Sequence, residues 1–254
     1  MYNTFRYADI LFKRWIMGYS HKAYSRTGNR DKNEDSYCVF TGERVLCAAL
    51  ADGMGGFSGG EIASETVIQA FEQALERDVM TLPVNIILYA NDMILQRQKE
   101  LGNKMKTTAA VVRIDDTWAH IAHVGDSRVY AFKDAKVVFQ TLDHTAAQMS
   151  VEVGEITPQE IRSHPDRCVL TKALGSSDEL RPSLTQLPKD SFDCILMCTD
   201  GFWGSVTEKD MCNCLSQSRS PQQWLELMQE IRDKNILNDD DNNTAIAIMK
   251  QREG

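Results

Sequence analysis

The stretch that decides the fold is Val45-Leu46-Cys47-Ala48-Ala49-Leu50-Ala51-Asp52-Gly53-Met54-Gly55-Gly56. Its unbroken apolar run, Val45 to Ala51, is typical of a strand buried on both faces. The run ends in Asp52, and the glycines that follow let backbone come close to a bound ion or phosphate. A single Asp-Gly pair is most often a turn. Here a second pair, Asp200-Gly201, also follows a buried strand, which makes the turn alone a weaker explanation.

Acidic clusters recur along the chain, and each stands beside an apolar run. They are Asn33-Glu34-Asp35, Asp52-Gly53, Gly125-Asp126-Ser127-Arg128, Asp200-Gly201 and Asp239-Asp240-Asp241-Asn242. Adjacent carboxylates repel one another unless positive charge lies among them. Converging carboxylates hold hard divalent cations such as Mg²⁺ or Mn²⁺. Taken alone, the cluster at 239–241 would be a solvated acidic loop, and Arg30 beside Glu34 would be an ordinary ion pair.

Periodicity predicts the elements that carry these clusters. Apolar residues at helical spacing predict a helix over 62–75, and Pro83 opens a second helix that runs to Leu101. Four short β-rich segments then suggest an antiparallel meander: 109–114, 118–124, 129–132 and 136–140. Further on we expect a strand over 194–198, a helix capped by Ser220-Pro221, and a last strand over 245–249. Residues 143–177 are polar, with a capping box at Thr157-Pro158-Gln159-Glu160, and form an inserted segment.

Composition narrows the class of protein. The chain has 254 residues and a net charge of −8, which disfavours nonspecific binding to nucleic acid or anionic membrane. No apolar run reaches the length of a membrane span. Seven cysteines without regular spacing argue against a disulfide framework and favour a reducing, cytoplasmic compartment. We expect one domain over residues 1–254, of α+β class, with the amphipathic stretch Phe5 to Trp15 packed on that domain.

The order of the motifs resembles the metal-dependent type 2C (PPM) serine/threonine protein phosphatases, in particular their bacterial branch. The resemblance runs from about Gly28 to Met249, and its motifs are specific only as an ordered set. They are Arg30-x-x-Asn33-Glu34-Asp35, Asp52-Gly53-Met54-Gly55-Gly56, Thr107-Thr108, Gly125-Asp126-Ser127-Arg128, Asp143-His144-Thr145, Gly154-Glu155-Ile156-Thr157, His164-Pro165, Leu170 to Gly175, Asp200-Gly201 and Asp241-Asn242-Asn243-Thr244.

The resemblance implies a fold and a site. The fold is a four-layer α-β-β-α sandwich with two central antiparallel sheets, and the segment at about 143–177 matches the family's flap. Asp52 would bridge two Mn²⁺ or Mg²⁺ ions. Asp200 and Asp241 would complete the first metal site, and Glu34 and the carbonyl of Gly53 would serve the second. Asp126, shared with Asp200, matches a third and weaker site.

The resemblance also implies a reaction. A metal-bridged hydroxide would hydrolyse phosphoserine or phosphothreonine in proteins, with no phosphoenzyme. Arg30 would hold the substrate phosphate, and Asp35 would orient or deprotonate the metal-bound water. The partners would be phosphorylated proteins and a cognate serine/threonine kinase.

Two positions depart from the family pattern. Met54 replaces a histidine that the animal branch uses as the proposed general acid, so a metal-bound water or another residue would protonate the leaving group. Lys106 replaces the usual glycine before Thr107-Thr108, where it is either tolerated or adds positive charge near the substrate. His144 and His164 in the flap are expected to be structural.

Two rival functions deserve comparison. Cys38 and Arg44 have the C-x5-R spacing of a cysteine phosphatase, but Glu43 and Phe40 suit a phosphate cradle poorly, and we reject that function. The second rival is a catalytically inactive phosphatase fold that serves as a binding module. It would require lost metal ligands, and every expected carboxylate is present.

Overall fold

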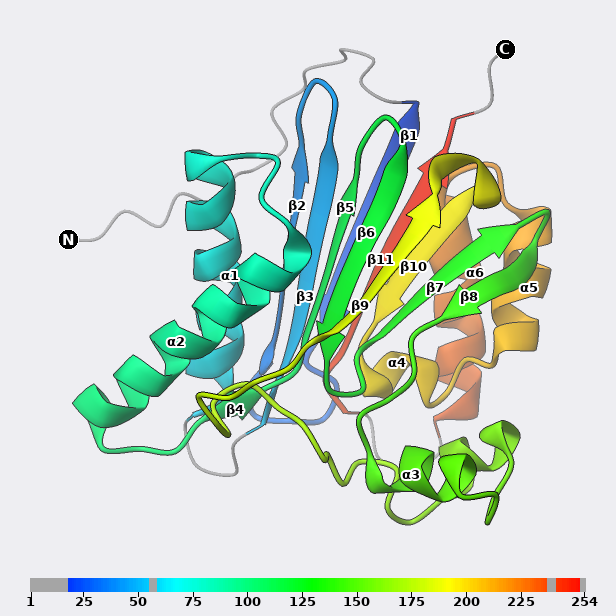
Figure 1. Ribbon diagram of the computed structural model, residues 1–254. Helices are drawn as coiled ribbons and strands as arrows, with labels where there is room; N and C mark the ends of the chain where they lie inside the picture. Colours follow the sequence, from blue (N-terminus) through cyan, green and yellow to red (C-terminus); the bar gives the residue numbers. More distant parts are fainter. Residues whose placement is uncertain (1–17, 55–58, 237–240, 252–254) are drawn as a thin grey trace.

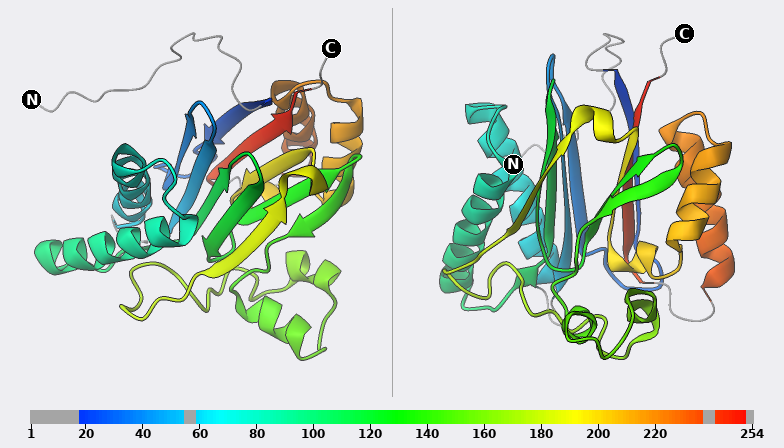
Figure 2. Two further views of the ribbon diagram at one scale, coloured as in Figure 1. Left: turned by 45° about the horizontal axis from the view of Figure 1, so that its top comes forward. Right: turned by 45° about the vertical axis from the view of Figure 1, so that its right-hand side comes forward.

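Two antiparallel sheets lie face to face, and each carries helices on its outer side (Figure 1, Figure 2). The computed structural model describes residues 18–54, 59–236 and 241–251. The stretch Phe5 to Trp15, Gly55-Gly56 and Asp239-Asp240 lie outside the described residues. Figure 2 shows the helix-sheet-sheet-helix order along its right-hand view, which confirms the α-β-β-α sandwich implied by the resemblance.

The first sheet has the strand order β2-β3-β5-β6-β9, and a short strand β4 also pairs with β3. Its strands are β2 (Asp35–Thr41), β3 (Leu46–Met54), β4 (Lys106–Thr107), β5 (Ala109–Ile114), β6 (Trp118–Val124) and β9 (Ser183–Pro188). The second sheet has the order β1-β11-β10-β7-β8. Its strands are β1 (Tyr19–Arg26), β7 (Arg128–Lys133), β8 (Lys136–Gln140), β10 (Cys194–Cys198) and β11 (Asn243–Lys250).

Helices α1 (Gly60–Arg77) and α2 (Pro83–Leu101) lie on the first sheet, and α5 (Glu208–Gln217) and α6 (Pro221–Asn235) lie on the second (Figure 1). The short helix α4 (Asp200–Trp203) follows β10 directly. The flap contains α3 (Ala146–Glu152) and a 3-10 turn η1 (Pro158–Ser163), and another 3-10 turn, η2 (Lys189–Ser191), follows β9. The predicted capping box at Thr157 and Glu160 is present at the start of η1.

Strand β3 explains why the opening apolar run shows no alternation. Leu46 and Leu50 face the second sheet and belong to the core between the sheets. Cys47 and Ala49 point the other way and pack with residues of α1 and α2. Because both faces of β3 are covered, every residue from Leu46 to Ala51 is buried.

The predicted four-strand meander is wrong at its centre. Strands β5 and β6 pair in the first sheet, and β7 and β8 pair in the second, but β7 takes β10 as its other neighbour. The chain changes sheet at Gly125, whose φ of 99° lies in the left-handed region. A Cβ there would also lie 2.6 Å from a side-chain carbon of Thr108, so this crossing requires glycine.

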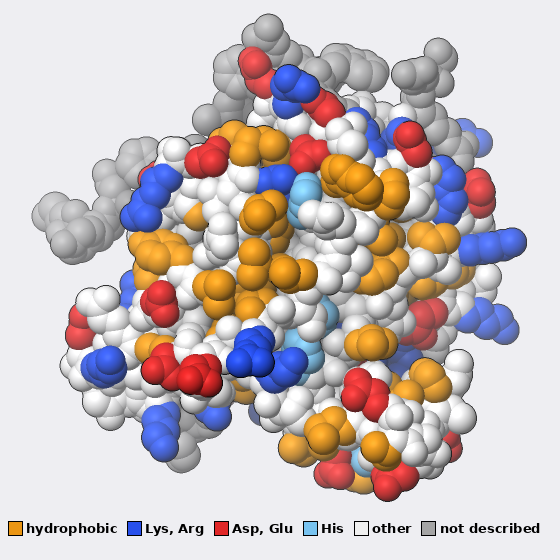
Figure 3. All heavy atoms as spheres, viewed as in Figure 1, with side chains coloured by type: hydrophobic (Ala, Val, Ile, Leu, Met, Phe, Trp, Pro, Cys, Tyr) orange, Lys and Arg blue, Asp and Glu red, His pale blue; other side chains and the backbone are white. Residues whose placement is uncertain are grey.

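Helix α2 leaves part of the first sheet uncovered. Hydrophobic side chains gather across the middle of the face seen in Figure 3. A groove of about 350 Å³ there lies between the start of α2 and strands β6 and β9, and Leu82 and Leu184 line it.

Candidate metal centre

The predicted site residues meet at one end of the sandwich. A cavity of about 690 Å³ opens there, and its lining includes Arg30, Glu34, Asp52, Gly53, Asp126, Asp200 and Asp241. These residues come from strand ends and connections that are far apart in the sequence: before β2, on β3, between β6 and β7, after β10 and before β11. Asp35 is not among the lining residues and lies buried at the first position of β2, opposite Asp52.

Backbone contacts fix the pair of loops that carries Glu34 and Gly53. The N–H of Gly53 donates to the carbonyl of Glu34 at 3.0 Å. A Cβ on Gly53 would lie 2.2 Å from the carbonyl oxygen of Gly60, so only glycine fits against the start of α1. The close approach holds the Gly53 backbone beside the Glu34 side chain at the cavity.

Two threonines hold Asp52 in place from the next strand. The hydroxyl of Thr108 accepts the backbone N–H of Asp52 at 2.9 Å, and the hydroxyl of Thr107 donates to the Asp52 carbonyl at 2.9 Å. The Thr108 hydroxyl also meets that of Ser127 at 2.7 Å. These bonds join β3 to the connection between β6 and β7, where Asp126 lies, and so link the two sheets at the site.

Asp126 is positioned by a buried aromatic residue. The indole N–H of Trp203 donates to the Asp126 carbonyl at 2.9 Å. The guanidinium of Arg128 lies 3.6 Å from the centre of the Trp203 ring. Arg128 also forms a bidentate pair with Asp143, the first residue of the flap, with N–O distances of 2.8 and 2.7 Å. The flap is therefore anchored beside Asp126.

The carboxylates raise one another's pKa. Burial, followed by repulsion from neighbouring aspartates, raises the pKa values of Asp52 and Asp126 well above the usual range. The pKa of Asp200 is raised by burial and then by Asp241. Such a site disfavours several negative charges at once unless cations share it.

Asp35 has an unused oxygen beside this cluster. Its Oδ2 accepts from the hydroxyl of Thr199 at 3.0 Å, but its Oδ1 is buried and has no hydrogen-bond partner. Burial and the repulsion of Asp200 raise the pKa of Asp35. A buried carboxylate oxygen without a donor indicates a site that expects another group, such as a hydrated cation.

Two carboxylates of the site are engaged by other side chains. Arg30 donates from Nε and Nη2 to the two oxygens of Asp241, each at 2.8 Å. The thiol of Cys168, in the flap, donates to Asp200 Oδ2 at 3.4 Å. Within the described residues, no three acidic, histidine or cysteine side chains form a closed ligand cage in this arrangement.

The residues nevertheless fit a divalent cation. Six carboxylates and the backbone of Gly53 line the cavity, and oxygen donors of this kind suit Mg²⁺ and Mn²⁺. The unpartnered Oδ1 of Asp35 and the mutual repulsion of the aspartates point the same way. For Asp241 to become a metal ligand, its carboxylate must give up the two hydrogen bonds from Arg30 and bind the ion instead.

Supporting residues escaped the sequence analysis. Asn242 accepts the N–H of Glu34 at 2.8 Å and donates to the carbonyls of Thr27 and Lys32 at 2.7 and 2.9 Å. Arg232, only 1% exposed, reaches from α6 to the carbonyl of Gly201 at 3.2 Å and that of Asp241 at 3.5 Å. Asn242 stands inside a quoted motif and was identifiable there, whereas a lone arginine in an amphipathic helix gives no such signal.

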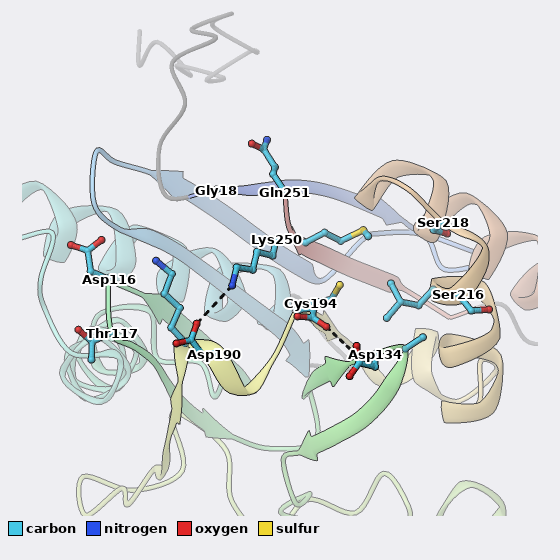
Figure 4. Close-up of a pocket in the computed structure, with 15 residues that line it drawn as sticks. Gly18, Asp116, Thr117, Asp134, Asp190, Cys194, Ser216, Ser218, Lys250 and Gln251 are labelled. Atoms are coloured by element: carbon cyan, nitrogen blue, oxygen red, sulfur yellow. Dashed lines mark hydrogen bonds and ion pairs between the residues drawn. The ribbon is translucent and has the colours of Figure 1, made fainter. Parts of the chain in front are cut away.

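A larger cavity lies elsewhere and differs in chemistry. It has a volume of about 1220 Å³. Its lining includes the residues at the start of β1 and the end of β11, the turn between β7 and β8, and η2 (Figure 4). Three of its four aspartates form ion pairs: Asp190 with Lys250 at 3.8 Å, Asp193 with Lys133 at 2.8 Å, and Asp116 with Arg44. Size alone would favour this cavity, but the converging and mutually repelling carboxylates favour the smaller one.

The cysteine-phosphatase alternative finds no support in the geometry. Cys38 lies in the middle of β2, and burial followed by the nearby Glu72 raises its pKa to about 11. A nucleophilic cysteine needs the thiolate, which this environment disfavours. Arg44 pairs with Asp116 on the surface rather than with any cradle around Cys38.

The comparisons with known proteins agree with this arrangement. The family model described as "Protein phosphatase 2C" matches residues 18–241. The serine/threonine protein phosphatase PstP of Mycobacterium tuberculosis is 33% identical over 192 residues, which cover 73% of this chain and 36% of PstP. The chain thus matches only about a third of that relative's length.

Solved structures show the same fold. The crystal structure of the serine/threonine phosphatase Stp1 from Staphylococcus aureus superposes with a TM-score of 0.82 at 26% identity, covering 96% of this chain and 100% of Stp1. The catalytic domain of PstP in complex with two manganese ions superposes with a TM-score of 0.78 at 29% identity, covering 92% of this chain and 99% of that domain.

Proposed function

This chain belongs to the protein phosphatase 2C family, and on that premise we propose that it is a metal-dependent hydrolase of phosphoserine and phosphothreonine in proteins. The observation that carries the proposal is the convergence of Glu34, Asp52, Asp126, Asp200 and Asp241 on one cavity whose mouth also holds an arginine. We further propose that the chain acts as one catalytic domain, with the flap at about 143–177 reaching the cavity through Cys168 and Leu170.

The cofactor of this proposal is Mn²⁺ or Mg²⁺, two per site. Asp52 would bridge both ions, Asp200 and Asp241 would complete the first site, and Glu34 with the Gly53 carbonyl would serve the second. Asp126 with Asp200 would form a third, weaker site. When bound, the cations supply Lewis-acid activation of water and neutralise the charge of the carboxylates and the phosphate.

Arg30 would bind the phosphate, and Asp35 would orient or deprotonate the attacking water. A guanidinium fork matches two phosphate oxygens, so Arg30, once released from Asp241, would orient the phosphate and stabilise its developing charge. Asp35 Oδ1, which has no donor, would accept a hydrogen bond or a proton from the attacking water. Met54 lines the cavity and carries no proton to give, so it cannot be the general acid.

The setting of the reaction is also part of the proposal. A phosphoprotein phosphatase needs a kinase that makes its substrate, and we propose a cognate serine/threonine kinase and a role in signalling. All the cysteines are free thiols, which supports a reducing compartment such as a bacterial cytoplasm. Among the described residues, no helix is both long and apolar enough to cross a membrane.

The test is hydrolysis of a phosphothreonine peptide by the wild type and by Asp52→Asn, with Mn²⁺, with Mg²⁺ and with EDTA. We expect activity only with metal, and a loss of at least about 10²-fold in kcat for the variant, because the bridging charge is removed. Asp190→Asn is the matched control, since it removes the same charge from a side chain that is 95% exposed near the other cavity.

Each contrary result has a distinct meaning. Activity that survives EDTA and Asp52→Asn would overturn the metal mechanism, and its loss in Cys38→Ser would restore the cysteine alternative. Tight binding of phosphopeptide without turnover under any metal condition would instead favour the inactive binding module.

A further inference from the structure

Lys106 is not one of the residues that line the metal cavity, but its strand partner and a near neighbour in the sequence both are. Strand β4 pairs with β3 so that Lys106 lies directly opposite Met54, and Thr107 lies opposite Gly53. Side chains of directly opposed residues in an antiparallel pair project from the same face. Met54 lines the cavity, so the Lys106 side chain rises from the cavity face.

A second neighbour gives the same orientation. Thr108 follows Lys106 by two positions and also lines the cavity. Residues two apart in extended chain point to the same side. Thr107, between them, is fully buried and points away, where its hydroxyl binds the Asp52 carbonyl. Lys106 itself is exposed.

The backbone that carries Lys106 is held rigidly. Thr107 exchanges hydrogen bonds with Leu174 of the segment after the flap helices, with N–O distances of 3.4 and 2.9 Å. The N–H of Thr108 donates to the Asp52 carbonyl at 2.9 Å. The backbone at Lys106 is therefore held beside the strand that carries Asp52, and its exposed side chain sets how far the ammonium group can reach.

Lys106 also differs from the other cations at this cavity. The guanidinium of Arg30 forms an ion pair with Asp241, and Lys32 pairs with Glu61 at 2.8 Å. Within the part of the chain that the structure describes, the side chain of Lys106 makes no hydrogen bond or ion pair. An exposed lysine whose side chain has no partner is ordinary on a protein surface, but this one lies beside a cavity lined by six carboxylates, in a chain of net charge −8.

We propose that Lys106 selects substrates whose phosphorylated residue is flanked by an acidic side chain. The proposal rests on the proposed phosphatase function and names the class of segment that this site prefers. Met54 lies two residues along β3 from Asp52, and Lys106 lies opposite Met54 on the neighbouring strand. The separation between Asp52 and Lys106 is therefore roughly the length of two to three residues of an extended peptide. The preferred glutamate or aspartate therefore lies about two or three positions from the phosphorylated residue.

The size of the effect follows from exposure. An ion pair in water between two flexible side chains contributes about 0.2–1 kcal/mol, which is roughly a one-and-a-half- to fivefold preference. Reversing the lysine charge replaces attraction with repulsion, so the ratio should change on the order of tenfold. Screening by salt should reduce both the preference of the wild type and the change caused by the reversed charge.

The experiment compares two phosphothreonine peptides. The acidic peptide carries Glu at the second and third positions on each side of the phosphothreonine, and the neutral peptide carries Gln at the same positions. The readout is the ratio of kcat/KM for the acidic peptide to that for the neutral peptide, with Mn²⁺ at low ionic strength. We expect wild type to favour the acidic peptide, Lys106→Gln to lose the preference, and Lys106→Glu to invert it. Lys136→Glu is the control, because Lys136 is an exposed lysine on the β7–β8 hairpin, at the other end of β7 from Asp126.

A binding readout separates this inference from the phosphatase function. The same two peptides with a non-hydrolysable phosphonate in place of the phosphate ester are titrated into the four proteins by fluorescence anisotropy. A failure to hydrolyse p-nitrophenyl phosphate with metal would overturn the proposed function, while the Kd ratios would still test Lys106. Equal ratios for wild type, Lys106→Glu and Lys136→Glu in both assays would overturn the role of Lys106.

Discussion

His144 joins the flap to the strand that precedes Asp126, and its hydrogen bonds fix its protonation. Its Nδ1 accepts the N–H of Gly125 at 3.1 Å, so Nε2 carries the hydrogen and donates to the hydroxyl of Ser183 at 2.9 Å. The ring of His123 stacks on it with centroids 4.8 Å apart. Burial, followed by repulsion from His123 and Lys172, lowers the pKa of His144 to about 3.

This lowered pKa predicts sensitivity to acid. The unfolded chain takes up a proton at His144 near pH 6.5, whereas the folded protein does so only near pH 3, so stability falls as pH drops through that window. His144→Gln, which cannot titrate, should lose several degrees less melting temperature than wild type between pH 7.5 and 5. His21→Gln, at an exposed histidine, is the control. Equal losses in wild type and His144→Gln would contradict the assignment.

At the scale of elements, helix α6 supports the loops that carry Asp200 and Asp241 through the side chain of Arg232. A Cβ on Gly201 would lie 2.1 Å from the Asn242 carbonyl oxygen, so the loops that carry Asp200 and Asp241 touch at this glycine. Arg232 donates to the backbone carbonyls of both loops. The helix thus fixes the distance between two ligands of the first proposed metal site.

Removing this support should weaken metal binding as well as the fold. Arg232→Met keeps the bulk of the side chain but leaves buried carbonyls with fewer donors, at a cost of about 1–3 kcal/mol in the free energy of unfolding. We expect a several-fold rise in the Kd for Mn²⁺, measured by calorimetry on the folded variant. The control is Arg26→Met, whose exposed partners Asp233 and Gln229 lie on the same helix. Mn²⁺ affinity equal to that of the control would refute this function of α6.

The elements divide into those that the sequence predicts and those that it does not. Strand β3 and the helices α1 and α2 were predictable, because burial on one or two faces leaves a clear apolar pattern. Four strands were not predicted: β1, β2 and β9 are edge strands, and β4 has only two residues. Edge strands keep polar side chains that prevent further pairing, and their mixed burial hides the period of two.

The candidate site divides in the same way. Its carboxylates follow apolar runs and stand in an ordered set of motifs, so Asp52, Asp200 and their partners could be named in advance. The supports act across long separations in sequence: Arg232 reaches residues 31 positions back, and Asn242 reaches 208. Nothing local marks such contacts, since they exist only once the two sheets have come together. The change of sheet at Gly125 was missed for the same reason.

For the whole molecule, the core between the sheets holds the two halves of the site together. Asp52 belongs to one sheet, and Asp200 and Asp241 flank strands of the other. Leu50, fully buried, packs between the sheets two residues before Asp52. The closeness of the ligands therefore depends on apolar packing rather than on any covalent link.

Truncating that packing should loosen the sandwich. Leu50→Ala removes buried methyl groups and leaves a cavity, at a cost of about 2–5 kcal/mol in the free energy of unfolding by urea. Leu184→Ala, at a leucine that is 61% exposed, should cost less than about 0.5 kcal/mol. A Leu50→Ala cost as small as that of the control would mean that the helices, rather than the core between the sheets, hold the halves together.

The pairing of β1 with β11 has a practical consequence for engineering. Tyr19 lies directly opposite Lys250 in that ladder, so the first and last strands of the described part of the chain are neighbours (Figure 1). A short linker could join them, and the polypeptide could be reopened at the β7–β8 turn, where Asp134 and Ala135 connect neighbouring strands. Such a circular permutant would keep every proposed ligand in its own loop while presenting new termini. An affinity tag or a fluorescent reporter could then be attached there, away from the carboxylate cavity.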